Sequence, residues 1–172
     1  MIIKMYPAQE GDAFLVSLDS GSGTKNIVID MGLSETYYSE IRPDLVRMKS
    51  DGQKVDLLII THIDQDHIQG AIEFIKDNGI DQSVIEVQEV WHNSFRHLQF
   101  DKKVTLSNSE KSILDTIIAQ NKHAKVEGRG NISAKQGSSL ASLLLEYGYN
   151  WNASCQSNAI CLENRKPHKF DG

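Results

Sequence analysis

The sequence is poor in cysteine, with only Cys155 and Cys161 among 172 residues. Five residues separate them, which fits neither a disulfide framework nor the two-residue spacing of a zinc knuckle or redox pair. We therefore expect both to be buried thiols. Long apolar runs are also missing, since the stretch at residues 55–60, apolar except for Asp56, is too short to cross a bilayer. Residues 1–5 lack the basic and apolar segments of an export signal, so we expect a cytoplasmic protein.

Negative charges outnumber positive ones, with 23 Asp and Glu against 18 Lys and Arg. A formal net charge of -5 argues against a protein that coats phosphate backbones, although a local metal or basic cluster can still receive an anion. No Gly-x-Ser-x-Gly occurs, so serine nucleophile chemistry has no support. The small residues at 19–23 lack the glycine-lysine element of a phosphate loop, and they predict a hairpin instead.

What is present is a pattern in which strand and helix alternate. Residues 55–60 are apolar except for Asp56, which is typical of a strand that is covered on both faces. Apolar residues at helical spacing follow until Asn78 and Gly79, which supply a stop. The other expected elements are a strand around 85–91, a helix from Ser107, a short helix over 140–145 that ends at Gly148, and the start of a strand at 159–162. The alternation predicts an α/β fold with the sheet inside and the helices outside.

The most informative segment joins the first of these strands to its helix. Residues 61–70 are Thr-His-Ile-Asp-Gln-Asp-His-Ile-Gln-Gly, and they contain His62, Asp64, Asp66 and His67. Four metal-binding side chains thus fall at the carboxyl end of a strand, where α/β proteins gather their ligands. Imidazole and carboxylate are donors that zinc, manganese and iron accept. The alternative is a solvated loop in which Asp64 or Asp66 caps the helix and complements its dipole.

The order His-x-Asp-x-Asp-His, followed by Ile and then by a glycine two residues later, resembles the signature loop of the metallo-β-lactamase fold superfamily. Most members have His where this chain has Asp64, and the aspartate variant resembles the hydrolase domains of competence proteins that process DNA. Residues 26–32, Asn-Ile-Val-Ile-Asp-Met-Gly, are similar to the family's strand that ends in Asp-x-Gly. Residues 91–97 and 148–152 resemble segments of predicted hydrolases encoded beside bacterial anti-phage defence genes.

The resemblance implies an αββα sandwich and a hydrolase with two divalent ions, either zinc or manganese. His62 and Asp64 would hold one ion, and Asp66 and His67 the other. A water shared by the ions would lose a proton near neutral pH and act as the nucleophile. Asp66 would be the catalytic residue, which orients this water and then protonates the leaving group. Asp30 would support the site by accepting an N–H from a ligand histidine or from the loop backbone.

His92 ends the strand expected around residues 85–91, on the same side of the sheet as the metal loop. It is either a further ligand or substrate contact, or a histidine that the backbone satisfies at a strand end.

Two parts of the family pattern have no convincing match before Gly172: the downstream aspartate that bridges the metals and the last histidine. We therefore expect residues 1–172 to be a single metallo-hydrolase domain that is truncated at its C-terminal end. Only the N-terminal part of the sandwich would be present, and the missing half, a partner subunit or a second copy in a homo-oligomer would complete it. A degenerate member with an incomplete site is the alternative.

Three functions stay open on this basis. The first is hydrolysis of a phosphodiester in a nucleic acid or nucleotide, which would suit a nuclease or a role in anti-phage defence. The second is hydrolysis of a lactone, thioester or lactam, since one metal platform serves many bonds in the superfamily. The third is a non-catalytic module with an incomplete metal site.

Overall fold

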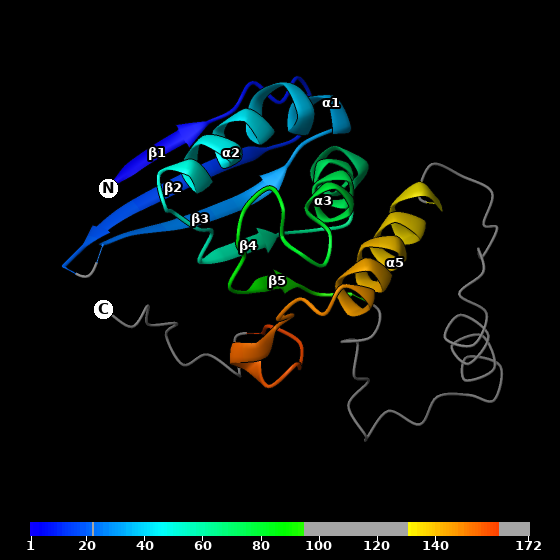
Figure 1. Cartoon of the computed structure of the whole chain (residues 1–172). Helices are drawn as coiled ribbons and strands as arrows, with labels where there is room; N and C mark the ends of the chain where they lie inside the picture. The colour runs from blue at the N-terminus through cyan, green and yellow to red at the C-terminus, as the bar shows by residue number, and fades with distance from the viewer. Residues whose placement is uncertain (22, 95–130, 162–172) are drawn as a thin grey trace, which may run out of the picture.

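The computed structural model describes residues 1–21, 23–94 and 131–161 (Figure 1). Within them the chain forms a five-stranded sheet in the order β1-β2-β3-β4-β5. The strands are β1 (Ile2–Met5), β2 (Ala13–Ser20), β3 (Gly23–Met31), β4 (Leu57–Ile60) and β5 (Val90–His92). Strand β2 runs antiparallel to its neighbours β1 and β3, whereas β4 and β5 run parallel to β3. The carboxyl ends of β3, β4 and β5 therefore meet at one edge of the sheet.

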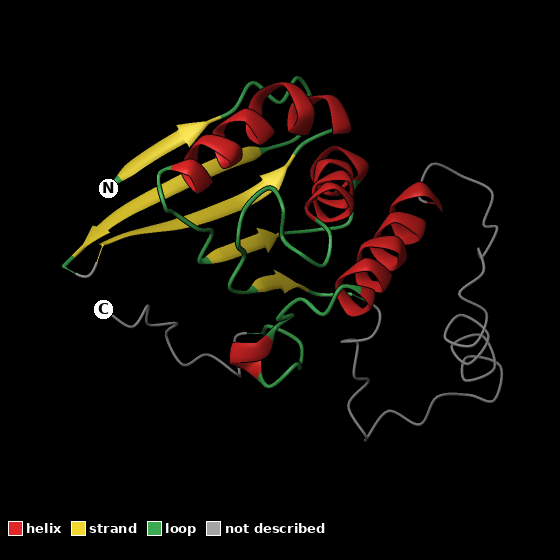
Figure 2. Cartoon of the chain, in the orientation of Figure 1, coloured by secondary structure: helices red, strands yellow, loops and turns green. Residues whose placement is uncertain are grey.

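The helical segments lie mainly on one face of this sheet (Figure 2). They are α1 (Ser34–Thr36), the π-helical turn η1 (Tyr37–Ile41), α2 (Arg42–Ser50), α3 (Gln65–Asn78), α5 (Asn131–Glu146) and the 3₁₀ turn η3 (Ala153–Cys155). Helix α3 packs on β3 and β4, and α5 packs against α3. No helix in the described part of the chain combines the length and apolarity that a membrane span requires.

The two faces of the sheet differ in how well they are covered. One row of aligned side chains, one from each of β2 to β5, is buried in the core with the helices: Leu15, Val28, Leu58 and Val90. The neighbouring row points to the other face and is only half-buried: Phe14, Ile29, Ile59 and Trp91. Met5 continues this second row onto the edge strand β1 and is 71% exposed. In the described ranges, one apolar face is covered by helices and the other keeps solvent contact.

Most of the expected elements are confirmed. The α/β arrangement is present, the residues at 19–23 join β2 and β3 as a hairpin, and the strand over 55–60 is found as β4. Helix α3 ends at Asn78, followed by Gly79 with a φ of 62°. The helix expected at 140–145 is longer than predicted, because it begins at Asn131. The helix expected from Ser107 lies outside the described residues.

Three expectations are corrected. The strand expected around 85–91 forms only from Val90, because the N–H groups of Val84 and Ile85 donate to Oδ1 of Asn78 at 2.9 Å instead of to a neighbouring strand. Residues 159–161 form no strand, and the N–H of Ile160 donates to Oδ1 of Asn93 at 2.9 Å.

The cysteines are not buried either. Cys161 is exposed and Cys155 is half-buried, because both follow α5 in a segment of turns at the surface. The expectation that both thiols are buried is therefore wrong.

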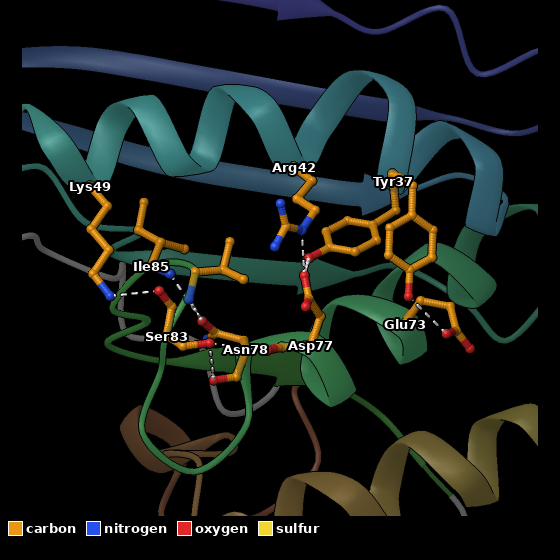
Figure 3. A network of polar contacts seen from close by, with 10 residues as sticks. Tyr37, Arg42, Lys49, Glu73, Asp77, Asn78, Ser83 and Ile85 are labelled. Carbon is orange, nitrogen blue, oxygen red and sulfur yellow. Dashed lines mark hydrogen bonds and ion pairs between the residues drawn. The ribbon is translucent and has the colours of Figure 1, made fainter.

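Polar contacts attach α3 to the helices before it (Figure 3). Oδ2 of Asp77 accepts the hydroxyl of Tyr37 at 2.7 Å and Nε of Arg42 at 2.6 Å. Burial alone would raise the pKa of Asp77, but the hydrogen bonds from Arg42 and Tyr37 outweigh it and lower this pKa below its ordinary value. This network attaches the carboxyl-terminal turn of α3 to η1 and α2.

Candidate metal centre

The loop between β4 and α3 lies at the edge where the parallel strands end. Asp64 is the N-cap residue of α3, with extended backbone angles of φ -69° and ψ 146°. Its carbonyl accepts the N–H groups of His67 and Ile68 at 3.0 Å, but its side chain makes no capping hydrogen bond. The carboxylate of Asp64 is 62% exposed, so it remains available to a ligand. The helix-capping interpretation therefore does not account for Asp64.

His67 lies in the first turn of α3 and is buried. Its Nδ1 is 3.1 Å from Oδ2 of Asp30, and its Nε2 is 3.4 Å from Oδ2 of Asp66. Because an ionised carboxylate only accepts hydrogen bonds, the contact with Asp30 assigns the ring proton to Nδ1. Nε2 then carries a lone pair and faces the carboxylate of Asp66. This is typical of a metal-binding histidine, whose other ring nitrogen donates to a carboxylate.

Asp30 reaches this position through an irregularity in β3. The pairing of β2 with β3 shifts at Ala13 and Phe14, so that Asp30 is an extra residue with a φ of 52°. Aspartate tolerates this left-handed backbone better than most residues, and such bulges redirect a side chain next to functional sites. Oδ1 of the buried carboxylate accepts the N–H of Thr61 at 2.8 Å, and Oδ2 accepts the Thr61 hydroxyl at 2.6 Å. Together with Nδ1 of His67, three donors hold Asp30.

His62 approaches from the other end of the loop. Its Nδ1 lies 2.8 Å from Oγ1 of Thr61, and its Nε2 lies 3.8 Å from Oδ2 of Asp64. The ring centroids of His62 and His67 are 3.7 Å apart, with the planes inclined at 54°. The two imidazoles are therefore adjacent, and each has its Nε2 near a carboxylate of the loop.

Three donors in the described residues lie close enough to share one ion. A ligand atom from each of Asp30, His62 and His67 falls within 4.8 Å of the others. Nitrogen and carboxylate donors in such a group suit zinc or manganese, so the residues present fit a divalent metal. Asp64 and Asp66 flank the group beside the two Nε2 atoms. The structure thus brings the four loop residues together and places Asp30 beside them, with its carboxylate on the Nδ1 side of His67.

Sequence reasoning missed two residues of this site. The first is Thr61, which directly precedes the motif, so a hydroxyl next to a candidate ligand histidine was the signal that could have indicated it. Gly11, in the connection between β1 and β2, has a φ of +77°, and a Cβ built on it would lie 1.9 Å from the backbone oxygen of Asp66. Only glycine fits where this connection contacts the start of α3. The contact joins segments far apart in sequence, so no local pattern could have indicated it.

His92 ends β5 opposite Ile60, which places it at the same edge as the loop. It is 1% exposed, and its ring stacks on Trp151 with centroids 6.2 Å apart and an angle of 18°. Its N–H donates to Oδ1 of Asn152 at 3.0 Å, and its carbonyl accepts Nε1 of Trp151 at 2.7 Å. The structure therefore packs His92 into the segment after α5, and it stands outside the group of three donors.

Comparison with known proteins agrees with this geometry. A search of the curated proteins finds no match for the chain. The family model described as the metallo-beta-lactamase superfamily matches residues 8–130, well over half of the sequence. The match includes β2 to β5, α3 and the whole loop with its two histidines and two aspartates. The chain therefore belongs to the metallo-beta-lactamase superfamily.

Proposed function

We propose that this protein is a metal-dependent hydrolase that uses a metal-activated water to cleave a phosphodiester in a nucleic acid or nucleotide. Members of its superfamily are generally hydrolytic metalloenzymes. The observation that carries the proposal is the pair of adjacent imidazoles, 3.7 Å apart, each with Nε2 beside a loop carboxylate. This arrangement offers two neighbouring nitrogen and oxygen donor pairs at the carboxyl ends of parallel strands.

Each donor pair would hold one divalent ion in this proposal. His62 and Asp64 form the first pair, and His67 and Asp66 form the second. Ions in these positions would supply Lewis-acid stabilisation and an activated water near neutral pH. Asp30 and Thr61 hold the rings from the Nδ1 side, which leaves Nε2 free for coordination.

Asp66 has the position of a proton carrier. Its side chain is 36% exposed and its Oδ2 is 3.4 Å from Nε2 of His67, so the carboxylate borders both the donor group and solvent. In the proposed reaction Asp66 orients the attacking water, takes up its proton on the carboxyl group and delivers it to the leaving oxygen. The backbone of Asp66 is held by its contact with Gly11, which favours a fixed orientation of the side chain.

Two considerations favour phosphorus over an acyl centre. Two closely spaced divalent ions suit in-line displacement, because they stabilise both the attacking and the leaving oxygen. The aspartate at position 64 also follows the motif variant that resembles hydrolase domains of DNA-processing competence proteins. The same resemblance, with that of residues 91–97 and 148–152, supports a nuclease in anti-phage defence as the specific form of the proposal.

The half-buried apolar face of the sheet supports a proposal about partners. The row formed by Phe14, Ile29, Ile59 and Trp91 would be stabilised by a second apolar sheet on it. In an αββα sandwich that sheet comes from the second half of the fold, so we propose that such a half, supplied by further chain or by a partner subunit, completes the domain.

The test combines metal loading with a panel of reporter substrates. The protein is loaded with zinc or manganese and assayed against phosphodiester, lactone, thioester and lactam reporters. We expect hydrolysis of the phosphodiester alone. Exclusive hydrolysis of an acyl reporter would replace the proposed substrate class, and metal binding without any hydrolysis would favour the non-catalytic module.

Asp66→Asn provides the matched test of mechanism. An amide keeps the shape of the side chain but cannot carry the transferred proton, so turnover should fall by about 10²–10⁴-fold while the fold stays intact. Glu73→Gln is the control, since Glu73 lies on the same helix and contacts Lys76 and Tyr38 instead of the loop. Unchanged turnover in an Asp66→Asn protein shown to contain metal would refute the role of Asp66.

A further inference from the structure

The two histidines of the loop are held in different ways. His67 contacts the carboxylate of Asp30 directly, with Nδ1 3.1 Å from Oδ2. His62 is joined to Asp30 through Thr61, whose Oγ1 is 2.8 Å from Nδ1 of His62 and 2.6 Å from Oδ2 of Asp30. The hydroxyl of Thr61 thus links the buried carboxylate by hydrogen bonds to the more exposed of the two rings.

The direction of these hydrogen bonds follows from the chemistry of the groups. An ionised carboxylate has no proton to donate, so the Thr61 hydroxyl must donate to Asp30. A hydroxyl has one proton, and once it is given to Asp30 the oxygen can only accept from His62. Nδ1 of His62 therefore carries the ring proton, and the lone pair lies on Nε2, 3.8 Å from Oδ2 of Asp64.

We propose that Thr61 is a positioning residue whose hydroxyl sets the tautomer of His62, and so selects Nε2 as the metal-binding atom of that ring. The backbone N–H of Thr61 independently holds Oδ1 of Asp30 at 2.8 Å. After loss of the hydroxyl, Asp30 keeps two of its three donors, the Thr61 N–H and Nδ1 of His67, whereas Nδ1 of His62 loses its partner Oγ1, so the main effect falls on His62. The tautomer assignment stands without the proposed function, and only its consequence for metal binding rests on that proposal.

The first test measures the tautomers directly in metal-free protein. Long-range ¹H–¹⁵N correlation spectra at pH 8, where an ordinary histidine is neutral, distinguish a ring protonated on Nδ1 from one protonated on Nε2. We expect the Nδ1–H form for both His62 and His67 in the unmodified chain. An Nε2–H form at His62 overturns the proposal without any variant being made.

Two substitutions separate the hydroxyl from the shape of the side chain. Thr61→Val keeps the branched shape and removes the hydroxyl, and Thr61→Ser keeps the hydroxyl and removes a methyl group. In Thr61→Val we expect His62 to shift to a mixture in which Nε2–H is prominent, while His67 stays Nδ1–H. Thr61→Ser should retain the Nδ1–H form at both rings. An unchanged His62 tautomer in a folded Thr61→Val protein overturns the proposal.

The consequence for metal binding is measured by calorimetric titration with zinc. Removing a group that orients a ligand histidine typically costs 10–100-fold in metal affinity, so Thr61→Val should weaken binding by about that factor and Thr61→Ser should not. His62→Ala distinguishes the two proposals. Unaltered zinc binding in His62→Ala would refute the proposed metal site, whereas weakening in His62→Ala with none in Thr61→Val would refute the positioning role of Thr61 alone.

Discussion

Two carboxylates of this molecule make similar contacts but have different consequences. Asp77, at the far end of α3, accepts from Tyr37 and Arg42, and Asp30, at the sheet edge, accepts from Thr61 and His67. The guanidinium of Arg42 has no lone pair, so the network of Asp77 ends there and can only attach helices to each other. The imidazole of His67 keeps a lone pair on Nε2, so the network of Asp30 continues towards a ligand.

The difference shows how a hydrogen-bond network can be assigned a structural or a functional part. What matters is whether a partner of the carboxylate keeps a nitrogen lone pair that can coordinate a metal. Figure 3 shows the structural network, in which the carboxylate of Asp77 accepts hydrogen bonds from Tyr37 and Arg42.

The largest expected difference between the two ends of α3 is in stability, and it is measured by substituting the glycine at each end. Gly11, against the amino end, and Gly79, after the carboxyl end, both have positive φ angles, but only Gly11 is crowded. Gly11→Ala should lower the free energy of unfolding by about 1–2 kcal/mol for the left-handed backbone plus about 1–3 kcal/mol for overlap with Asp66. Gly79→Ala should cost only the backbone contribution. Urea unfolding measures both, and equal losses would show that the contact with Asp66 is unimportant.

The two carboxylates are compared by measuring zinc affinity and the free energy of unfolding in Asp30→Asn and in Asp77→Asn. Asp30→Asn should reduce zinc affinity by about 10–100-fold, because an amide group cannot accept from all three donors and the rings lose their orientation. Asp77→Asn should leave zinc affinity unchanged and lower the free energy of unfolding by about 1 kcal/mol through weaker contacts with Arg42 and Tyr37. Titration calorimetry measures the zinc affinity of both variants, and urea unfolding measures their stability. Loss of zinc affinity in Asp77→Asn would remove the distinction.

A smaller effect is expected from low pH, which should lower the stability that the contacts of Asp44 and Asp77 contribute. Burial alone would raise the pKa of Asp44, but hydrogen bonds from Lys4 and Tyr6 lower it, and the pKa of Asp77 is lowered in the same way by Arg42 and Tyr37. The unfolded chain, with ordinary aspartate pKa values near 3.9, therefore binds more protons than the folded chain below about pH 4.

The resulting stability is fully present above about pH 4 and is lost as the pH falls through the lowered pKa values. Urea unfolding of the metal-free protein at a series of pH values should show this decline. Asp77→Asn should make the decline shallower, and an identical pH dependence in the variant would contradict the role of Asp77.

The sequence predicted the parts of the molecule that depend on neighbouring residues. The apolar run at 55–60, the helical spacing after Ile68 and the stop at Gly79 act locally, so the strand, the helix and the loop between them were found. The four ligand candidates could be named for the same reason, since they lie within one loop.

What the sequence could not predict depends on contacts between distant segments. The bulge that directs Asp30 arises from the pairing of β2 with β3, and Gly11 contacts Asp66 across more than fifty residues. In each case a single tertiary contact determined the local structure.

The central claim is that the loop after β4 holds a divalent metal through its two imidazoles. It is tested most directly by calorimetric titration of the chain with zinc, in a background of Cys155→Ser and Cys161→Ser that removes thiol ligands. We predict binding that is lost when His62 and His67 are both replaced by glutamine, with the fold verified by circular dichroism. Zinc binding of equal affinity and stoichiometry in that folded double variant would contradict the account.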